Sequence, residues 1–132
     1  MRAKYFVACF LAMALLVVSS AALVAHHSVT AEFDPTKPIE FDGVIKKVLW
    51  MNPHIYTEVE AKGPDGKATI YRVEGGAPNS LYRQGWRSDV IKAGDPVHVR
   101  GVRAKSPTSN NVGNAQMTNA AGKRIFSGNP EQ

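Results

Sequence analysis

The sequence predicts a mainly β domain: a small OB-fold-like barrel of five to six strands, with one short helix between the third and fourth strands. Three observations favour it. Residues 39–74 alternate apolar with polar residues in three segments separated by turns, helix signals follow at Pro78–Gln84, and the alternation resumes at Pro96. A three-strand meander, a helix and further strands is the order of an OB-fold. An open sheet with one packed helix has the same order and remains the alternative.

Residues 1–25 are typical of a cleavable secretory signal peptide. Arg2 and Lys4 precede an apolar run, Tyr5 to Val18, and small residues follow it. The run is shorter than the about 20 apolar residues of a membrane-spanning helix, and no stop-transfer charges follow it. We therefore expect a periplasmic protein that leaves the membrane after cleavage. The only cysteine, Cys9, leaves with the leader, so the mature chain has no thiol or disulfide chemistry.

Two cleavage sites satisfy the small-residue rule. One leaves Leu23 as the first mature residue, and the other, between Ala25 and His26, leaves His26 first. The choice has a chemical consequence, because a terminal histidine offers an α-amino nitrogen and an imidazole nitrogen to the same metal ion. The cleavage rule alone leaves both sites open.

Residues 26–38 are expected to form an extended arm, because its two X-Pro dipeptides disfavour a helix. Alternation from Ile39 to Trp50 then predicts the first strand, and a slip in the pattern at Lys46 predicts a β-bulge. Asn52-Pro53 is the turn that ends this strand.

The remaining elements follow from turn residues and alternation. Strands are expected at His54–Ala61 and Ala68–Glu74, joined by the turn sequence Gly63-Pro64-Asp65-Gly66. The helix at Pro78–Gln84 has proline in its first turn and Gly85 as its stop. The last strands are predicted at Pro96–Arg103, Ala115–Thr118 and Arg124–Phe126. The barrel domain thus spans 39–127, and 128–132 form a C-terminal tail.

The distribution of charge and the motifs of the sequence indicate neither a nucleic-acid-binding protein nor a known class of enzyme. Two of the 16 lysines and arginines lie in the leader, so 14 remain against 11 acidic residues, a net charge of +3. These basic residues are interleaved with acidic ones rather than gathered in a patch, so we expect no nucleic-acid partner. Nucleophile-elbow, phosphate-loop and zinc-protease motifs are absent from the sequence, so no enzyme class is indicated.

Several motifs spread over almost the whole mature chain: the start His26-His27-Ser28, then Asn52-Pro53-His54, and then Gly85-Trp86. Together they resemble an uncharacterised family of small secreted bacterial proteins known as a domain of unknown function. The resemblance implies a periplasmic location, an OB-like barrel and a leader that ends directly before His26. It implies no established activity. Pro96 and His98 depart from the family pattern, and no role is carried over to them.

Copper is the cofactor that the histidines favour. The candidate metal ligands are His26, His27 and His54, because imidazole nitrogen suits Cu(II) and the terminal amine of His26 adds a further donor. An extended arm of this length spans up to about 40 Å, which is long enough to fold back toward a barrel rim. Met51 and Met117 are candidate thioether ligands for Cu(I), although packing is the usual role of such methionines.

Two main functions remain open. The first is an exported noncatalytic binding or accessory module, with a small ligand or a periplasmic protein as its partner. The alternative is a periplasmic copper-binding protein that uses the mature N-terminal histidine with His54. A barrel that grips oligosaccharide rests on fold analogy alone. Glu58 and Glu60 share a strand face, and we expect that face to be solvated rather than catalytic.

Overall fold

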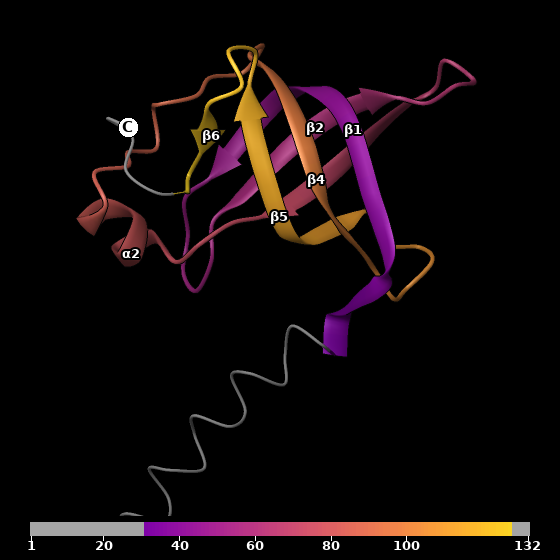
Figure 1. Cartoon of the computed structure of the whole chain (residues 1–132), viewed down its shortest axis with the longest axis horizontal. Helices are drawn as coiled ribbons and strands as arrows, with labels where there is room; N and C mark the ends of the chain where they lie inside the picture. Colours follow the sequence, from indigo (N-terminus) through magenta and orange to yellow (C-terminus); the bar gives the residue numbers. More distant parts are fainter. Residues whose placement is uncertain (1–30, 128–132) are drawn as a thin grey trace, which may run out of the picture. The chain divides into compact units, whose positions relative to one another are not determined.

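The computed structural model describes residues 31–127, in which seven elements build the fold (Figure 1). The strands are β1 (Phe33–Leu49), β2 (Tyr56–Lys62), β3 (Ala68–Glu74), β4 (Pro96–Ala104), β5 (Asn111–Asn119) and β6 (Arg124–Ile125), and the helix is α2 (Pro78–Arg83). The predicted leader, its predicted cleavage site and the two histidines at positions 26 and 27 lie outside the described residues.

The strands form one sheet in the order β3-β2-β1-β4-β5-β6 that curls into a barrel. A parallel contact between β3 and β5, with Arg72 opposite Asn111 and Val73 opposite Val112, closes the ring. The other neighbours are antiparallel. This closure, with α2 between β3 and β4, confirms the OB-like barrel and excludes the open sheet.

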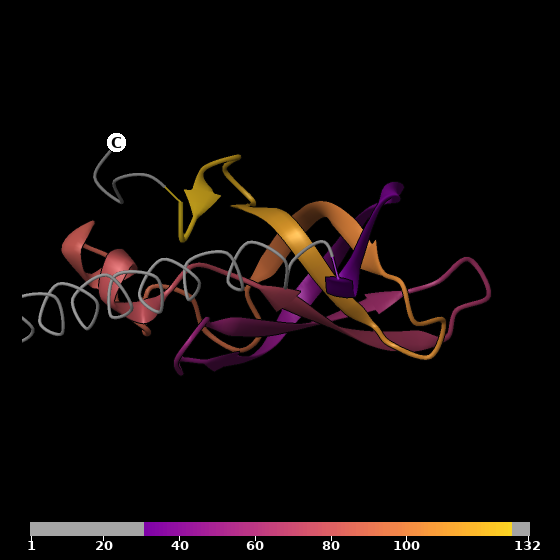
Figure 2. The same ribbon diagram turned by 90° about the horizontal axis from the view of Figure 1, so that it is seen from below.

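β1 is long because it pairs with two different strands in succession. Its first part pairs with β4 and its last part with β2, and the strand bends between them (Figure 2). The predicted bulge is confirmed, since the register shifts between Ile45 and Lys47. Gly43 lies at the crossing, where a Cβ atom would be 2.6 Å from Cγ1 of Val59. Glycine therefore lets β1 and β2 approach each other closely.

β1 begins at Phe33, six residues before the predicted start at Ile39. Residues 33–38, which we expected in the arm, are extended but belong to the sheet: Phe33 pairs with Ala104, and Pro38 with Val102. The reason is the Phe33 side chain, which is 3% exposed and packs its ring over Gly113. Burial of this ring anchors residues 33–38 to the sheet, although their prolines predicted a free arm.

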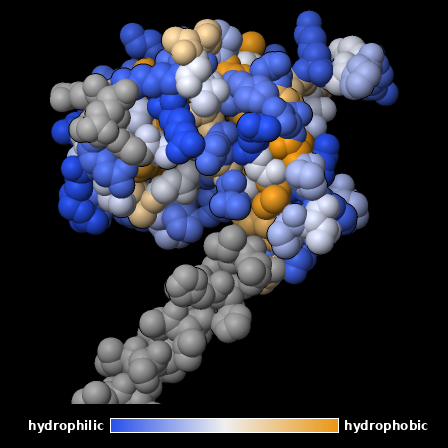
Figure 3. All heavy atoms as spheres, viewed as in Figure 1, coloured by the Kyte–Doolittle hydropathy of each residue, from blue (hydrophilic) through white to orange (hydrophobic). Residues whose placement is uncertain are grey.

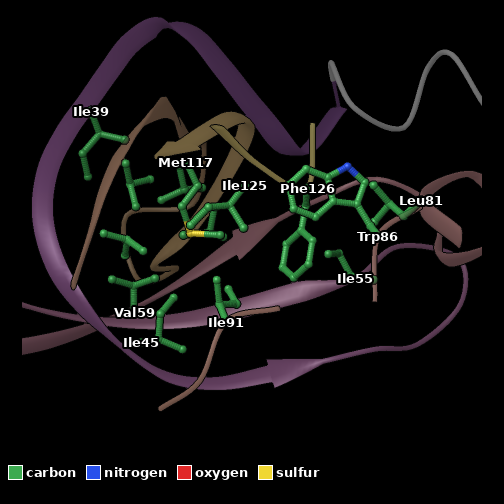
Figure 4. Packing of buried hydrophobic residues seen from close by; sticks show 14 residues of the cluster. Ile39, Ile45, Ile55, Val59, Leu81, Trp86, Ile91, Met117, Ile125 and Phe126 are labelled. Atoms are coloured by element: carbon green, nitrogen blue, oxygen red, sulfur yellow. The ribbon is translucent and has the colours of Figure 1, made fainter. Parts of the chain in front are cut away.

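The core fills the barrel and continues beneath α2 (Figure 4). Leu81 on the helix and Trp86 just after it are both buried, as expected. The ring of Trp86 makes an edge-to-face contact with Phe126, 5.5 Å between centroids. The helix thereby covers one end of the barrel, the end at which β1 passes into β2.

Candidate functional site

A part-buried polar pair on the barrel joins His54 to Glu74. His54 lies in the connection between β1 and β2, and Glu74 is the last residue of β3. The imidazole Nδ1–H donates a short hydrogen bond to Oε1 of Glu74. The Glu74 side chain is 15% exposed and that of His54 is 38% exposed. Because Nδ1 faces Glu74, Nε2 is the ring nitrogen through which His54 can bind a ligand.

Backbone contacts fix this pair in place. The Ile55 amide donates to the Gly76 carbonyl at 3.0 Å, and the Gly75 amide donates to the Ile55 carbonyl at 2.9 Å. A Cβ atom on Gly75 would lie 2.5 Å from Cγ1 of Ile55, so glycine is needed for this approach. The residues on either side of the His54–Glu74 pair are therefore held by the sheet itself.

A second ordered pair lies beside the first. The Arg72 guanidinium stacks over the Tyr56 ring, 4.2 Å from its centroid, and Tyr56 is the register partner of Glu74. The Arg72 Nε is buried and has no hydrogen-bond partner within residues 31–127. Glu58 is the register partner of Arg72. We call the side chains of His54, Tyr56, Glu58, Arg72 and Glu74 the His54 face.

The two glutamates singled out from the sequence do lie on the outward side of β2. Glu60 pairs with Lys46 at 3.6 Å, and Glu58 stands opposite Lys47 in the β1–β2 register. Hydrophilic residues cover much of the barrel surface in the view of Figure 3. These carboxylates therefore belong to a solvated, charge-balanced face.

His98, which the sequence left without a role, lies in a second polar cluster on β1 and β4. Its Nδ1–H donates to Asp42 at 2.7 Å and its Nε2–H to Glu40 at 3.0 Å. Arg100 approaches Glu40 at 3.3 Å. Since both ring nitrogens donate, the geometry suits the imidazolium form. The hydrogen bond that His98 donates to Asp42 is the main cause that raises the pKa of His98 above its ordinary value.

This raised pKa predicts how stability changes with pH. The His98 contribution is complete below the unfolded-state pKa of about 6.5 and is lost as pH rises through the higher folded-state pKa. Urea unfolding of the native protein and of His98→Gln should therefore differ most in mildly acidic buffer, and the difference should shrink above pH 6.5. Asp42→Asn should return the NMR-titrated pKa of His98 toward its ordinary value. An equal difference at all pH values would contradict this assignment.

The methionines and tryptophans occupy different environments. Met117 is 6% exposed and belongs to the core, which excludes it as an accessible thioether ligand, whereas Met51 is 46% exposed. Trp86 is buried. Trp50 is partly buried and contacts Tyr82 edge-to-face, with 5.2 Å between ring centroids. Core packing, the expected role of both tryptophans, thus accounts for Trp86 fully and for Trp50 in part.

Of the three histidines predicted as copper ligands, only His54 falls in the described part of the chain, since His26 and His27 lie outside it. Within residues 31–127 no group of three or more histidine, cysteine, aspartate or glutamate side chains is arranged to hold a metal ion. The sequence missed Glu74 as the partner of His54. The β2–β3 hairpin register could have identified this partner, because it sets Glu74 opposite Tyr56, which is two residues from His54.

A family model described as a family of unknown function (DUF6152) matches residues 13–114. Neither a curated protein nor a solved structure matches the chain. The helices of the described region include none that is long and apolar enough to cross a membrane.

Proposed function

The chain belongs to a family of unknown function, DUF6152, and from that premise we propose that it is an exported, noncatalytic binding module whose ligand is held on the His54 face. Export is supported by the basic start, apolar run and small residues of the leader. The periplasm is then the compartment in which the ligand is met.

The observation that carries this proposal is the pre-ordered pair of contacts on β2 and β3. OB-fold barrels bind ligands on their second and third strands and on the connection after the first strand. Here Glu74 orients His54 on that connection, and Tyr56 supports Arg72 on those strands. Side chains that are ordered before binding lower the entropic cost of binding. The site offers an imidazole, an aromatic edge and a cation to a small polar ligand.

The same geometry supports a noncatalytic role. Glu58 stands opposite Lys47 and Arg72, and Glu60 forms an ion pair with Lys46. Neighbouring cations thus balance the charges of both carboxylates, which suits recognition.

Thermal unfolding of the mature protein with the low-molecular-mass fraction of the periplasm tests the binding role. A ligand at 100 times its Kd stabilises the folded state by about 2.7 kcal/mol, so Tm should rise by several degrees. His54→Gln and Arg72→Gln should abolish this rise. Lys67→Gln, in the exposed β2–β3 turn, is the matched control and should keep it. No rise with the native protein, or an equal rise in all variants, would contradict the proposal.

Copper binding by His26, His27 and His54 is the second candidate. It is favoured by the carboxylate behind the His54 imidazole, because metal-binding histidines commonly donate their other ring N–H to a carboxylate. Intact mass first establishes whether His26 begins the mature chain. One extra residue before His26 then removes its free amine, and Cu(II) affinity should fall. Equal affinity of the native and extended proteins would contradict the terminal site.

A further inference from the structure

The connection between β1 and β2 behaves as the end of a hairpin. The register runs through Lys47 and Glu58, Val48 and Thr57, and finally Leu49 and Tyr56. The paired register ends there, and Met51 and His54 lie on either side of the bend at residues 52 and 53. Continuing the register by two steps would set Met51 opposite His54. Opposite positions of a hairpin share a face and lie about 5 Å apart at Cβ.

Burial follows the same alternation. Ile55 is 1% exposed and Trp50 packs partly against the core, so this opposite pair points inward. Met51 is 46% exposed and the His54 side chain is 38% exposed, so the next pair points outward. This alternation of burial matches the continued register, in which a thioether and an imidazole would share one exposed side of the connection.

We propose that Met51 and His54 form a Cu(I) site, in which the Met51 Sδ and the His54 Nε2 are the ligands and Glu74 orients the imidazole. This inference rests on the copper candidate of the proposed function and deepens it by naming the oxidation state and a ligand that is independent of the terminal amine. Thioether sulfur is a soft donor that selects Cu(I), whereas imidazole nitrogen does not distinguish Cu(I) from Cu(II) in this way.

The Glu74 carboxylate orients the His54 imidazole. By accepting the Nδ1–H, it fixes the tautomer in which Nε2 carries the lone pair for a metal. Glu74 is a positioning residue, because its bonded oxygen faces the imidazole rather than the site. Glu74→Gln should therefore weaken Cu(I) binding by about 10- to 100-fold, the usual effect of losing an outer-shell partner.

The test is an anaerobic titration of the mature protein with Cu(I) held by a chromophoric competing chelator, alongside a Cu(II) titration. Met51→Leu keeps the size and apolar character of the side chain but removes the sulfur. It should weaken Cu(I) binding by at least about tenfold and leave Cu(II) binding unchanged. His54→Gln should weaken both. Met117→Leu, a change at a buried methionine, is the matched control and should bind Cu(I) as the native protein does.

The outcomes separate this inference from the function on which it rests. If Met51→Leu binds Cu(I) as tightly as the native protein while His54→Gln does not, the Met51 ligand is wrong and the copper candidate stands. If the native protein holds neither copper ion against the chelator, both are wrong. If the extension before His26 lowers Cu(II) affinity but not Cu(I) affinity, the Met51–His54 site is supported. Circular dichroism of each variant confirms that it is folded.

Discussion

Replacing Trp86 with alanine is expected to lower the free energy of unfolding by about 3–5 kcal/mol, the usual cost of deleting a buried large aromatic side chain. Trp86 is 2% exposed and packs edge-to-face on Phe126 beneath α2. Alanine would leave a cavity at the end of the barrel that the helix covers. Native domains have only about 5–15 kcal/mol of stability, so this is a large share of the total. Urea unfolding followed by circular dichroism measures it.

Val90→Ala is the control for this prediction. Val90 follows Trp86 in the same loop but is 47% exposed, so its truncation should change stability by no more than about 0.5 kcal/mol. Should Trp86→Ala unfold at the same urea concentration as Val90→Ala, then the end of the barrel is not held by this side chain, and the described packing of α2 is wrong.

The order of the elements could be predicted because its signals are local. Alternation marks the strands, Gly63-Pro64-Asp65-Gly66 marks the β2–β3 turn, and the slip at Lys46 marks the bulge that the register shift confirms. Closure of the barrel follows from the same order once an OB-like topology is assumed. It depends on the contact of β3 with β5 at Val73 and Val112, which no local pattern encodes.

The start of β1 could not be predicted, because its cause is distant in sequence. Two prolines between Phe33 and Ile39 interrupt the alternation, and a lone phenylalanine carries no strand signal. What makes Phe33 a core residue is Gly113, eighty positions later, which leaves room for its ring. A nonlocal packing partner thus overrides local propensity.

In the candidate site, too, the features with local signals could be predicted and those with distant causes could not. The sequence placed His54 directly after the turn Asn52-Pro53, as the first residue of the second strand. It does follow that turn, but β2 begins two residues later at Tyr56, so His54 lies in the connection. The partners of His98 were missed because Glu40 and Asp42 meet it only through the β1–β4 register. Combining the outward faces of both strands with the expected OB-like pairing would have found them. The roles of His26 and His27 stay predictions.

Gly113→Ala is expected to destabilise the barrel by about 1–3 kcal/mol, the usual cost of overpacking. A Cβ atom at this position would lie 2.5–2.6 Å from three ring atoms of Phe33, so the ring must move away. Because Phe33 anchors the first residues of β1, their pairing with β4 should loosen before the rest of the sheet. Hydrogen exchange should therefore speed up at residues 33–38 and change little from Val44 to Leu49.

Making room at Phe33 should reverse part of this effect. Phe33→Leu alone removes buried area and destabilises, but in the double variant the shorter side chain relieves the contact with the new methyl group. The double-mutant cycle should therefore show a favourable coupling of about 0.5–3 kcal/mol between two residues eighty positions apart. Additive losses would instead mean that the two residues do not touch. The six residues from Phe33 to Pro38 would then be the free arm that the prolines predict, and β1 would begin at Ile39.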